Sequence, residues 1–208
     1  GAFVTGGSRA KYSNVNIGLA FNPDYLSEVT LMEYSLGVAY KVLPGFKVGA
    51  AWRILHATGK LSLPKAALGG AIHFDNLATT KYNGFRFGGQ YDGKNWGAGF
   101  TVRTGVDFTL SGDLSLQTGA NTSTPNGTGT VSNSFPIEAV LGGYYDVDKN
   151  LRLIAEYTYA NYAKNKQLDL TGTLLGGAVN LATTPIVQNW KDLHMGRLAA
   201  EYRGLGEY

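Results

Sequence analysis

The sequence has no cysteine and few charged residues. Without a thiol, the chain has no disulfide framework, no thiolate nucleophile and no cysteine ligand for zinc. Charged residues make up 16% of the 208 positions, against about 25% in soluble domains. The sequence also lacks a run of about 18–20 apolar residues, which a membrane-spanning helix needs. The net charge of +3 comes without a lysine- or arginine-rich run, so no nucleic-acid partner is expected.

Glycine and aromatic residues are abundant instead. The chain has 29 glycines, and phenylalanine, tryptophan and tyrosine make up 12% of it. Glycine and tyrosine are poor helix formers, which argues against a helical bundle. Disordered chains have few aromatic residues and high charge, so disorder is also disfavoured. The composition indicates an all-β protein.

Alternation of apolar and polar residues is strongest between Trp96 and Gln117. The even positions are apolar, small or threonine, and the odd positions are glycine or polar. This period is typical of a strand with one apolar and one polar face. Its length far exceeds the usual strand of about 5–6 residues. Similar alternation elsewhere predicts eight strands in all, at 12–21, 28–43, 45–63, 81–92, 95–117, 135–147, 150–171 and 187–203.

The connections between these predicted strands alternate in length. The short ones, at 44–45, 92–95 and 148–150, contain the proline, glycine, aspartate and asparagine of tight turns. The long ones are 64–80, 118–134 and 172–185. Short turns at one end and long loops at the other are typical of outer-membrane barrels. Aromatic residues flank the short turns, as they do at a membrane–water interface: Tyr40, Phe46, Tyr91, Trp96, Tyr144 and Tyr145.

We therefore predict an antiparallel up-and-down transmembrane β-barrel, with residues 1–208 in one domain. The alternative is a soluble lipocalin-like barrel or sandwich, in which the apolar faces point inward and the charged faces meet water. Strand length and the asymmetry of the connections favour the membrane barrel.

Four segments resemble, in order, the FadL-like family of outer-membrane long-chain fatty acid transporters. They are the hairpin from Ser35 to Trp52, the hairpin from Gly84 to Thr104 with its extension at 110–114, the stretch from Phe135 to Leu168, and the stretch from Asn189 to Arg203. The resemblance implies a fourteen-stranded channel with an N-terminal plug, which moves hydrophobic molecules inward.

The chain departs from that family in two respects. Family members are longer, and neither their plug with its Asn-Pro-Ala motif nor their last strands are seen here; Asn22-Pro23 is followed by Asp24. We therefore expect the chain to be part of a larger barrel. A closed eight-stranded barrel is the alternative, because eight strands suffice for closure.

Charged side chains on the polar face of the predicted strands would line the lumen. The arginines among them would attract the carboxylate of a passing molecule, or they would pair with carboxylates across strands and so neutralise buried charge. We favour the second interpretation. The candidates are Arg53, Arg86, Arg103, Asp107, Glu138, Arg152, Glu156, Arg197 and Glu201.

Two of the predicted long connections contain apolar stretches, at 66–72 and 174–179. They would form a groove that captures a hydrophobic ligand, or they would pack on each other as an extracellular cap. The candidate residues are Leu68, Ile72, Leu174, Leu175 and Val179.

No group of residues predicts catalysis, a cofactor or a metal site. His56, His73 and His194 lie in separate segments without ligand spacing, and Asp75 near His73 is only a formal candidate for a catalytic pair. The sequence therefore predicts a channel, not an enzyme, in the outer membrane of a Gram-negative bacterium.

The predicted function is passive uptake of hydrophobic molecules such as long-chain fatty acids or aromatic hydrocarbons. Its expected partners are that ligand, outer-membrane lipid with lipopolysaccharide, and an envelope protein. The alternative is a structural barrel that scaffolds an outer-membrane assembly.

Overall fold

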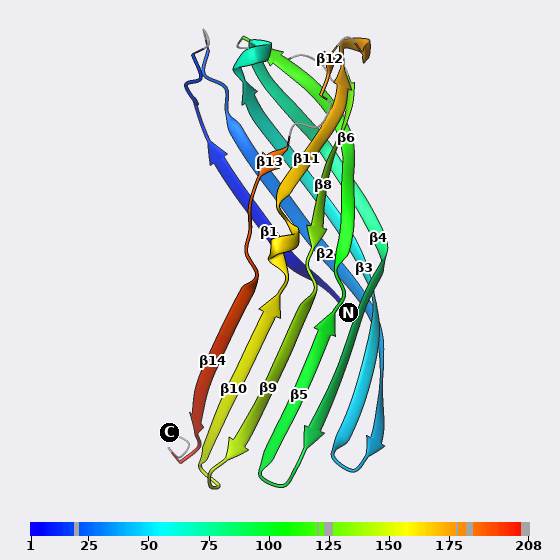
Figure 1. Ribbon diagram of the computed structural model, residues 1–208, viewed down its shortest axis with the longest axis vertical. Coiled ribbons are helices and arrows are strands. Elements are labelled where there is room, and N and C mark those ends of the chain that lie inside the picture. The colour runs from blue at the N-terminus through cyan, green and yellow to red at the C-terminus, as the bar shows by residue number, and fades with distance from the viewer. Residues whose placement is uncertain (19–20, 120, 123–126, 178, 182–184, 205–208) are drawn as a thin grey trace.

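A computed structural model describes the chain except for residues 19–20, 120, 123–126, 178, 182–184 and 205–208. The described strands form one curled, antiparallel sheet whose tight turns lie at one end and whose longer connections lie at the other (Figure 1). This confirms the prediction of an all-β, antiparallel fold.

In the described part of the chain, eight long strands form the sheet, and four of them are broken in the middle. The unbroken ones are β1 (Ala2–Tyr12), β2 (Tyr25–Leu43), β3 (Phe46–Lys65) and β4 (Gly70–Asp92). The broken ones are β5 (Trp96–Arg103) with β6 (Val106–Thr118), β8 (Gly127–Phe135) with β9 (Glu138–Asp146), β10 (Leu151–Ala160) with β11 (Gln167–Leu174), and β13 (Ile186–Val187) with β14 (Leu193–Tyr202). Shorter elements are β7 (Asn121–Thr122), β12 (Val179–Asn180) and the 3-10 helices η1 (Ala66–Leu68), η2 (Tyr162–Lys164) and η3 (Leu175–Gly177).

The breaks divide the sheet into two tiers. In the lower tier, beside the tight turns, β4 pairs with β5 and the order continues through β9 and β10 to β14. In the upper tier, β4 pairs with β6 and the order continues through β8 to β11. The long strands β2, β3 and β4 run through both tiers (Figure 1).

Several predicted boundaries are wrong. The first strand covers residues 2–12 rather than 12–21. The predicted loops at 64–80 and 118–134 contain the start of β4 and all of β8 except its last residue, Phe135. The β8 sequence contains two glycines and one asparagine, which have low strand propensity. Pairing with β6 on one side and β11 on the other holds these residues in the sheet nonetheless.

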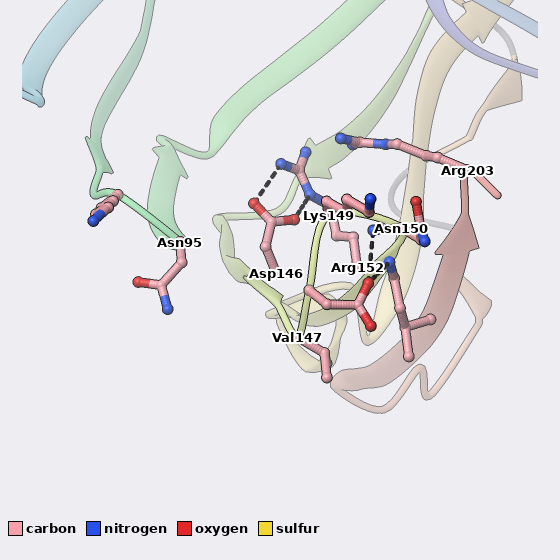
Figure 2. Close-up of a pocket in the computed structure, with 10 residues that line it drawn as sticks. Asn95, Asp146, Val147, Lys149, Asn150, Arg152 and Arg203 are labelled. Carbon is pink, nitrogen blue, oxygen red and sulfur yellow. Dashed lines mark hydrogen bonds and ion pairs between the residues drawn. The ribbon is translucent and has the colours of Figure 1, made fainter.

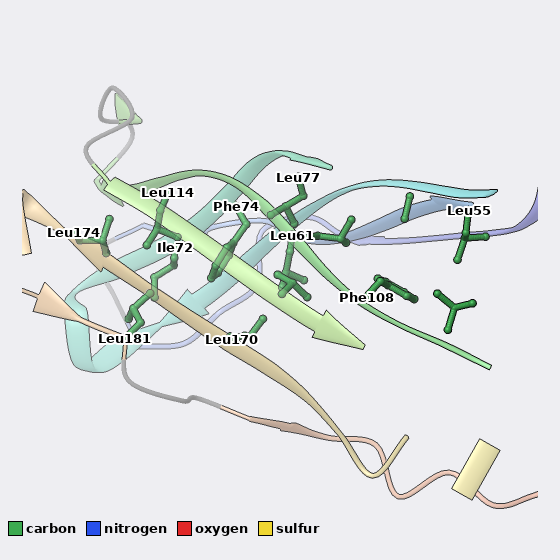
Figure 3. Close-up of a cluster of buried hydrophobic side chains, with 14 residues drawn as sticks. Leu55, Leu61, Ile72, Phe74, Leu77, Phe108, Leu114, Leu170, Leu174 and Leu181 are labelled. Carbon is green, nitrogen blue, oxygen red and sulfur yellow. The ribbon is translucent and has the colours of Figure 1, made fainter. Parts of the chain in front are cut away.

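In the lower tier the apolar side chains of the alternating pattern point outward, whereas in the upper tier they point into the core. Phe100 in β5 is 50% exposed on the outer face, whereas Phe108 in β6 is 6% exposed in the core. Both positions are even-numbered, so the predicted strand at 95–117 turns its apolar side from outside to inside. The upper core (Figure 3) consists of Leu55, Ala57, Leu61, Ile72, Phe74, Leu77, Val106, Phe108, Leu110, Leu114, Val131, Leu170, Leu174 and Leu181.

A one-residue phase shift in neighbouring strands causes this exchange. Arg103 and Val106 are three residues apart, yet both side chains are buried. Their partners across the sheet, Glu138 and Phe135, are also three residues apart. Since side chains in a regular strand alternate with a period of two, the odd spacing requires an irregular step. Pro136, which has no backbone N–H to donate, lies in that step.

The lower tier has the polarity and length of a bilayer-spanning wall. Its segments β5, β9, β10 and β14 contain 8, 9, 10 and 10 residues, close to the about 9–11 that a transmembrane strand needs. Its outer face carries exposed apolar side chains such as Phe87, Leu141 and Leu198. The upper tier has an apolar interior, as in a water-exposed sheet. Among the described residues, no helix is long and apolar enough to cross a membrane.

Candidate functional site

The inner face of the lower tier combines small residues with ion pairs. A hollow of about 470 Å³ lies over Gly97, Gly99 and Gly142, where the missing side chains leave room for the larger ones beside them. Glu156 of β10 accepts a hydrogen bond from Arg197 of β14 at 2.5 Å. This part of the inner face is therefore hollow, and its lining combines charged side chains with glycine and apolar surface.

A charged cavity of about 370 Å³ lies at the tight-turn end of this face (Figure 2). Arg152 donates two hydrogen bonds to Asp146, at 2.6 and 2.9 Å, and its guanidinium carbon lies 4.0 Å from the centroid of the Tyr144 ring. Arg203 lines the same cavity and donates to Glu201 at 2.9 and 3.0 Å. Three of the charged residues that line this cavity are thus in ion pairs, and the others that line it are Lys94, Asp148 and Lys149.

A second set of charges lies where the two tiers meet, and we call it the waist cluster: Glu33, Arg53, Arg86, Arg103 and Glu138. Glu33 and Arg53 are both buried, and Arg53 Nη2 donates to Glu33 Oε2 at 2.5 Å. Arg86 contacts the other oxygen of Glu33 at 3.3 Å. A buried carboxylate is stable in this position because two guanidinium groups neutralise it.

The waist cluster also holds the break between β5 and β6 in place. Arg53 Nη1 donates to the backbone oxygen of Thr104, inside that break, at 3.3 Å. Arg103 pairs with Glu138 at 3.1 Å, and its guanidinium carbon lies 4.4 Å from the centroid of the Phe135 ring. Three arginines face two glutamates, so the cluster has one positive charge in excess. The Nε atoms of Arg53 and Arg103 are buried without an acceptor among the described residues.

Above the waist cluster lies a mostly apolar cavity of about 420 Å³, which we call the upper cavity. Its apolar walls include Leu61, Leu77, Phe108, Leu110, Val131 and Leu168. Phe135 lines the upper cavity and also contacts Arg103, so this cavity borders directly on the waist cluster. A ligand in the upper cavity would lie on one side of the waist cluster, and the inner face of the lower tier would lie on the opposite side.

The structure groups most of the predicted lumen residues into ion pairs. Arg53, Arg86, Arg103 and Glu138 meet in the waist cluster. Paired positions lower in the sheet are Arg152, Glu156, Arg197 and Glu201. Two pairs are those of the interpretation that we favoured, Arg103 with Glu138 and Arg197 with Glu156. Arg53 and Arg86 pair instead with Glu33, and Arg152 with Asp146. That these residues line a passage for substrate stays a prediction.

Asp107 departs from the prediction. Its side chain is 68% exposed and pairs with Lys164, and it points away from the core that its neighbours Val106 and Phe108 join. The phase shift after Arg103 explains the error, because it places the odd positions of β6 on the outer face.

Glu33 belongs to the waist cluster but was not predicted from the sequence as a lumen residue. It is fully buried and binds two arginines. One signal was available: between Val29 and Tyr40, in the middle of a predicted strand, it is the only charged residue. A single charge at the centre of a long strand needs a partner across the sheet.

The predicted apolar loop residues separate into different environments. Ile72 and Leu174 are not loop residues: they lie in β4 and β11 and are buried in the upper core. Leu68 in η1 packs against the same core, whereas Leu175 in η3 is 51% exposed. Val179 lies in β12. A capture groove built on Ile72 or Leu174 is therefore excluded, because both help to fill the core.

The histidines do not meet one another in the sheet. His56 contacts Thr80, His73 contacts Gln117, and His194 contacts Tyr157. Within the described part of the chain, no group of three or more histidine, aspartate or glutamate side chains is placed to bind a metal ion.

Comparison with known proteins gives a family and a fold. Residues 3–203 match the model of the family described as outer membrane protein transport protein (OMPP1/FadL/TodX). The fold is similar to that of the toluene transporter TbuX of Ralstonia pickettii, with a TM-score of 0.79, 18% identity, and coverage of 99% of this chain and 61% of that one. None of the curated protein sequences matches the chain.

Two further structures are similar. A FadL homologue of Pseudomonas aeruginosa has a TM-score of 0.75 and 17% identity, with coverage of 97% of this chain and 52% of that one. The toluene transporter TodX of Pseudomonas putida has a TM-score of 0.72 and 16% identity, with coverage of 97% and 59%. The chain therefore spans between half and two thirds of the length of these structures.

Proposed function

The chain belongs to the family of outer membrane transport proteins that includes FadL and TodX, and we propose that it forms part of the wall of a channel for passive uptake of hydrophobic molecules across the outer membrane. Two of the structures with a similar fold are toluene transporters. Aromatic hydrocarbons are accordingly the first substrate class that we propose.

The observation that carries this proposal is the upper cavity. Its volume of about 420 Å³ lies within the about 300–1,000 Å³ of small-molecule sites, and its mostly apolar walls are typical of them. A molecule with one aromatic ring would exchange water for contacts with Phe108, Leu110 and Val131, and burial of apolar surface favours that exchange. The cavity would hold the ligand above the waist cluster.

Long-chain fatty acids are a second candidate class, which the charge of the waist cluster favours. The cluster has one positive charge in excess, because three arginines face two glutamates. A carboxylate reaching down from the cavity would meet Arg103 beside Phe135. Such a ligand would compete with Glu138 for that arginine, which lowers the expected gain.

The test is uptake by liposomes that contain the full-length protein, with toluene and with a fatty acid in separate arms. Val131→Trp would fill the upper cavity, whereas Thr128→Trp on the outer face of the same strand is the matched control. We expect Val131→Trp to abolish uptake and Thr128→Trp to retain it. Normal uptake by a folded Val131→Trp variant would contradict the proposal.

A further inference from the structure

A polar groove of about 400 Å³ lies on the outer face of the wall, at the level where the two tiers meet, and we call it the outer groove. Its residues come from β4, β6, β8, η2 and β11. Figure 1 shows η2 at this level, between the end of β10 and the start of β11. The exposed side chains of Asp107 and Lys164 line the groove, so it opens to the outside of the wall.

Three lysines line the outer groove, and all of them lie close to the lower tier. Lys81 lies between the part of β4 that pairs with β6 and the part that pairs with β5. Lys164 belongs to η2, and Lys166 directly precedes β11. Lys164 pairs with Asp107, whereas the ammonium groups of Lys81 and Lys166 have no partner among the described residues. Two cations of the groove are therefore available to a ligand.

Asp169, the second acidic residue of the outer groove, belongs to its upper end. It is in register with Ser132, which is in register with Thr109. Asp107 and its partner Ser134 form the next row toward the lower tier. The end of the groove beside the lower tier thus contains three lysines and one aspartate, which is an excess of two positive charges.

The surface directly below the outer groove is apolar. The chain that lines the groove in β8 continues through Ile137 to Leu141 of β9, and Phe100 of β5 is in register with Leu141. All three side chains are exposed on the outer face. Tyr82, next to Lys81, is exposed as well, as is typical of a ring at the membrane–water interface. An amphipathic molecule could therefore place an anionic head group in the groove and its acyl chains on the wall below.

We propose that the outer groove binds a phosphate group of lipopolysaccharide, held by Lys81 and Lys166. Barrels of this class place their short turns on the periplasmic side, so the groove is level with the outer leaflet, whose lipid carries phosphorylated sugars. Ammonium groups form short, charge-assisted hydrogen bonds with phosphate oxygens, and basic clusters beside a membrane-spanning segment attract anionic lipid. The inference goes beyond the proposed function, because neither lysine lines the upper cavity.

The test is native mass spectrometry of the full-length protein in detergent, after removal of bound lipid, in a titration with bisphosphorylated lipid A. The double variant Lys81→Gln/Lys166→Gln removes both unpaired cations. We expect its affinity for the most tightly bound lipid A to fall about 25-fold, or about 5-fold for each lysine. Lipid A with one phosphate should bind the unmodified protein more weakly than the bisphosphorylated form.

Lys94→Gln/Lys149→Gln is the matched control. It makes the same change in net charge with two exposed lysines at the tight-turn end, on the far side of the lower tier. Its affinity for lipid A should stay within about twofold of that of the unmodified protein. Equal affinities of the two double variants would overturn the inference.

Phosphatidylglycerol, titrated in a separate arm, tests whether the groove is a site for lipopolysaccharide. It should bind the unmodified protein more weakly than lipid A, and equal affinity for the two lipids would overturn the assignment. The proposed function is tested separately, because Lys81→Gln/Lys166→Gln should take up toluene at the rate of the unmodified protein. If the unmodified protein takes up neither toluene nor a fatty acid, the proposed function fails while the lipid A result still decides this inference.

Discussion

At the scale of the residue, the waist cluster shows how a charge is kept inside an all-β wall. Glu33 is fully buried on β2 and meets arginines from β3 and β4. The serine two residues along the same strand, Ser35, also donates to it at 3.0 Å. Three strands and the break between β5 and β6 are thus linked, because Arg53 also donates to the backbone oxygen of Thr104. Removal of one partner would leave charge buried without compensation.

Replacement of Glu33 by glutamine should therefore destabilise the protein by about 3–5 kcal/mol, the usual effect of breaking a buried ion pair. The measurement is thermal or urea unfolding of the full-length protein in detergent. Glu28→Gln is the control on the same strand, because Glu28 pairs with Arg9 at 3.4 Å in an exposed position and should cost less than about 1 kcal/mol. Equal losses of unfolding free energy in the two variants would show that the buried ion pairs of Glu33 stabilise the protein no more than an exposed ion pair does.

The ion pair of Asp107 with Lys164 should make the position of η2, beside the upper cavity, depend on pH. The ammonium group of Lys164 and the hydroxyl of Ser134 lower the pKa of Asp107 below its ordinary value of 3.8. A carboxylate with a lowered pKa contributes stability above pH 3.8, and this contribution is lost as the pH falls through the lowered value. Lys164 belongs to η2, whose Tyr162 ring packs on Trp190 at 5.6 Å.

We expect the tryptophan fluorescence, to which Trp190 contributes, to change below pH 3.8, as η2 is released from β6. Since Asp107 is exposed, the effect on overall stability should be small. The variant Asp107→Asn should lose this step in the titration. A fluorescence change of the same size at the same pH in the variant would assign the step to another group.

At the scale of the element, the notable feature is the exchange of faces within one long strand. Gly105 lies inside the break between β5 and β6, and a Cβ atom there would lie 2.9 Å from the backbone oxygen of Phe135. The break thus needs a residue without a side chain at this point. The two tiers can bury opposite faces only while this step is kept.

Gly105→Ala should accordingly destabilise the protein by about 1–3 kcal/mol, because a rigid backbone oxygen must move to admit the methyl group. Gly142→Ala is the matched control: its added Cβ would make only an ordinary contact, 3.6 Å from the backbone oxygen of Ala155. Unfolding in urea compares the two variants. A Gly105→Ala protein as stable as the control would refute the close approach at the break.

Strands β5 and β6 show what could and could not be predicted from the sequence. The alternation from Trp96 to Gln117 correctly indicated a long antiparallel strand, and the tight turn before it was also correct. Alternation by itself does not say which face points outward, so the inversion after Arg103 and the position of Asp107 were missed. The waist cluster depends on pairing between strands that are distant in the sequence, and local patterns do not contain that register.

At the scale of the whole molecule, the polarity of the two tiers predicts how the protein sits in the outer membrane. The outer face of the lower tier is apolar over the length of a bilayer-spanning strand. The outer face of the upper tier carries polar residues such as Thr109, Ser132 and Asp107. Since barrels of this class place their short turns on the periplasmic side, we expect the upper tier to project outward into water.

The absence of cysteine makes this arrangement directly testable, because each introduced thiol is the only one in the described chain. Thr109→Cys on the outer face of β6 should react with a membrane-impermeant maleimide in intact cells. Leu141→Cys, on the outer face of β9, should stay unlabelled there, because lipid covers it. Both should react after unfolding in detergent, which controls for expression. Labelling of Leu141→Cys at the rate of Thr109→Cys in intact cells would place the lower tier in water, and the soluble alternative would then have to be reconsidered.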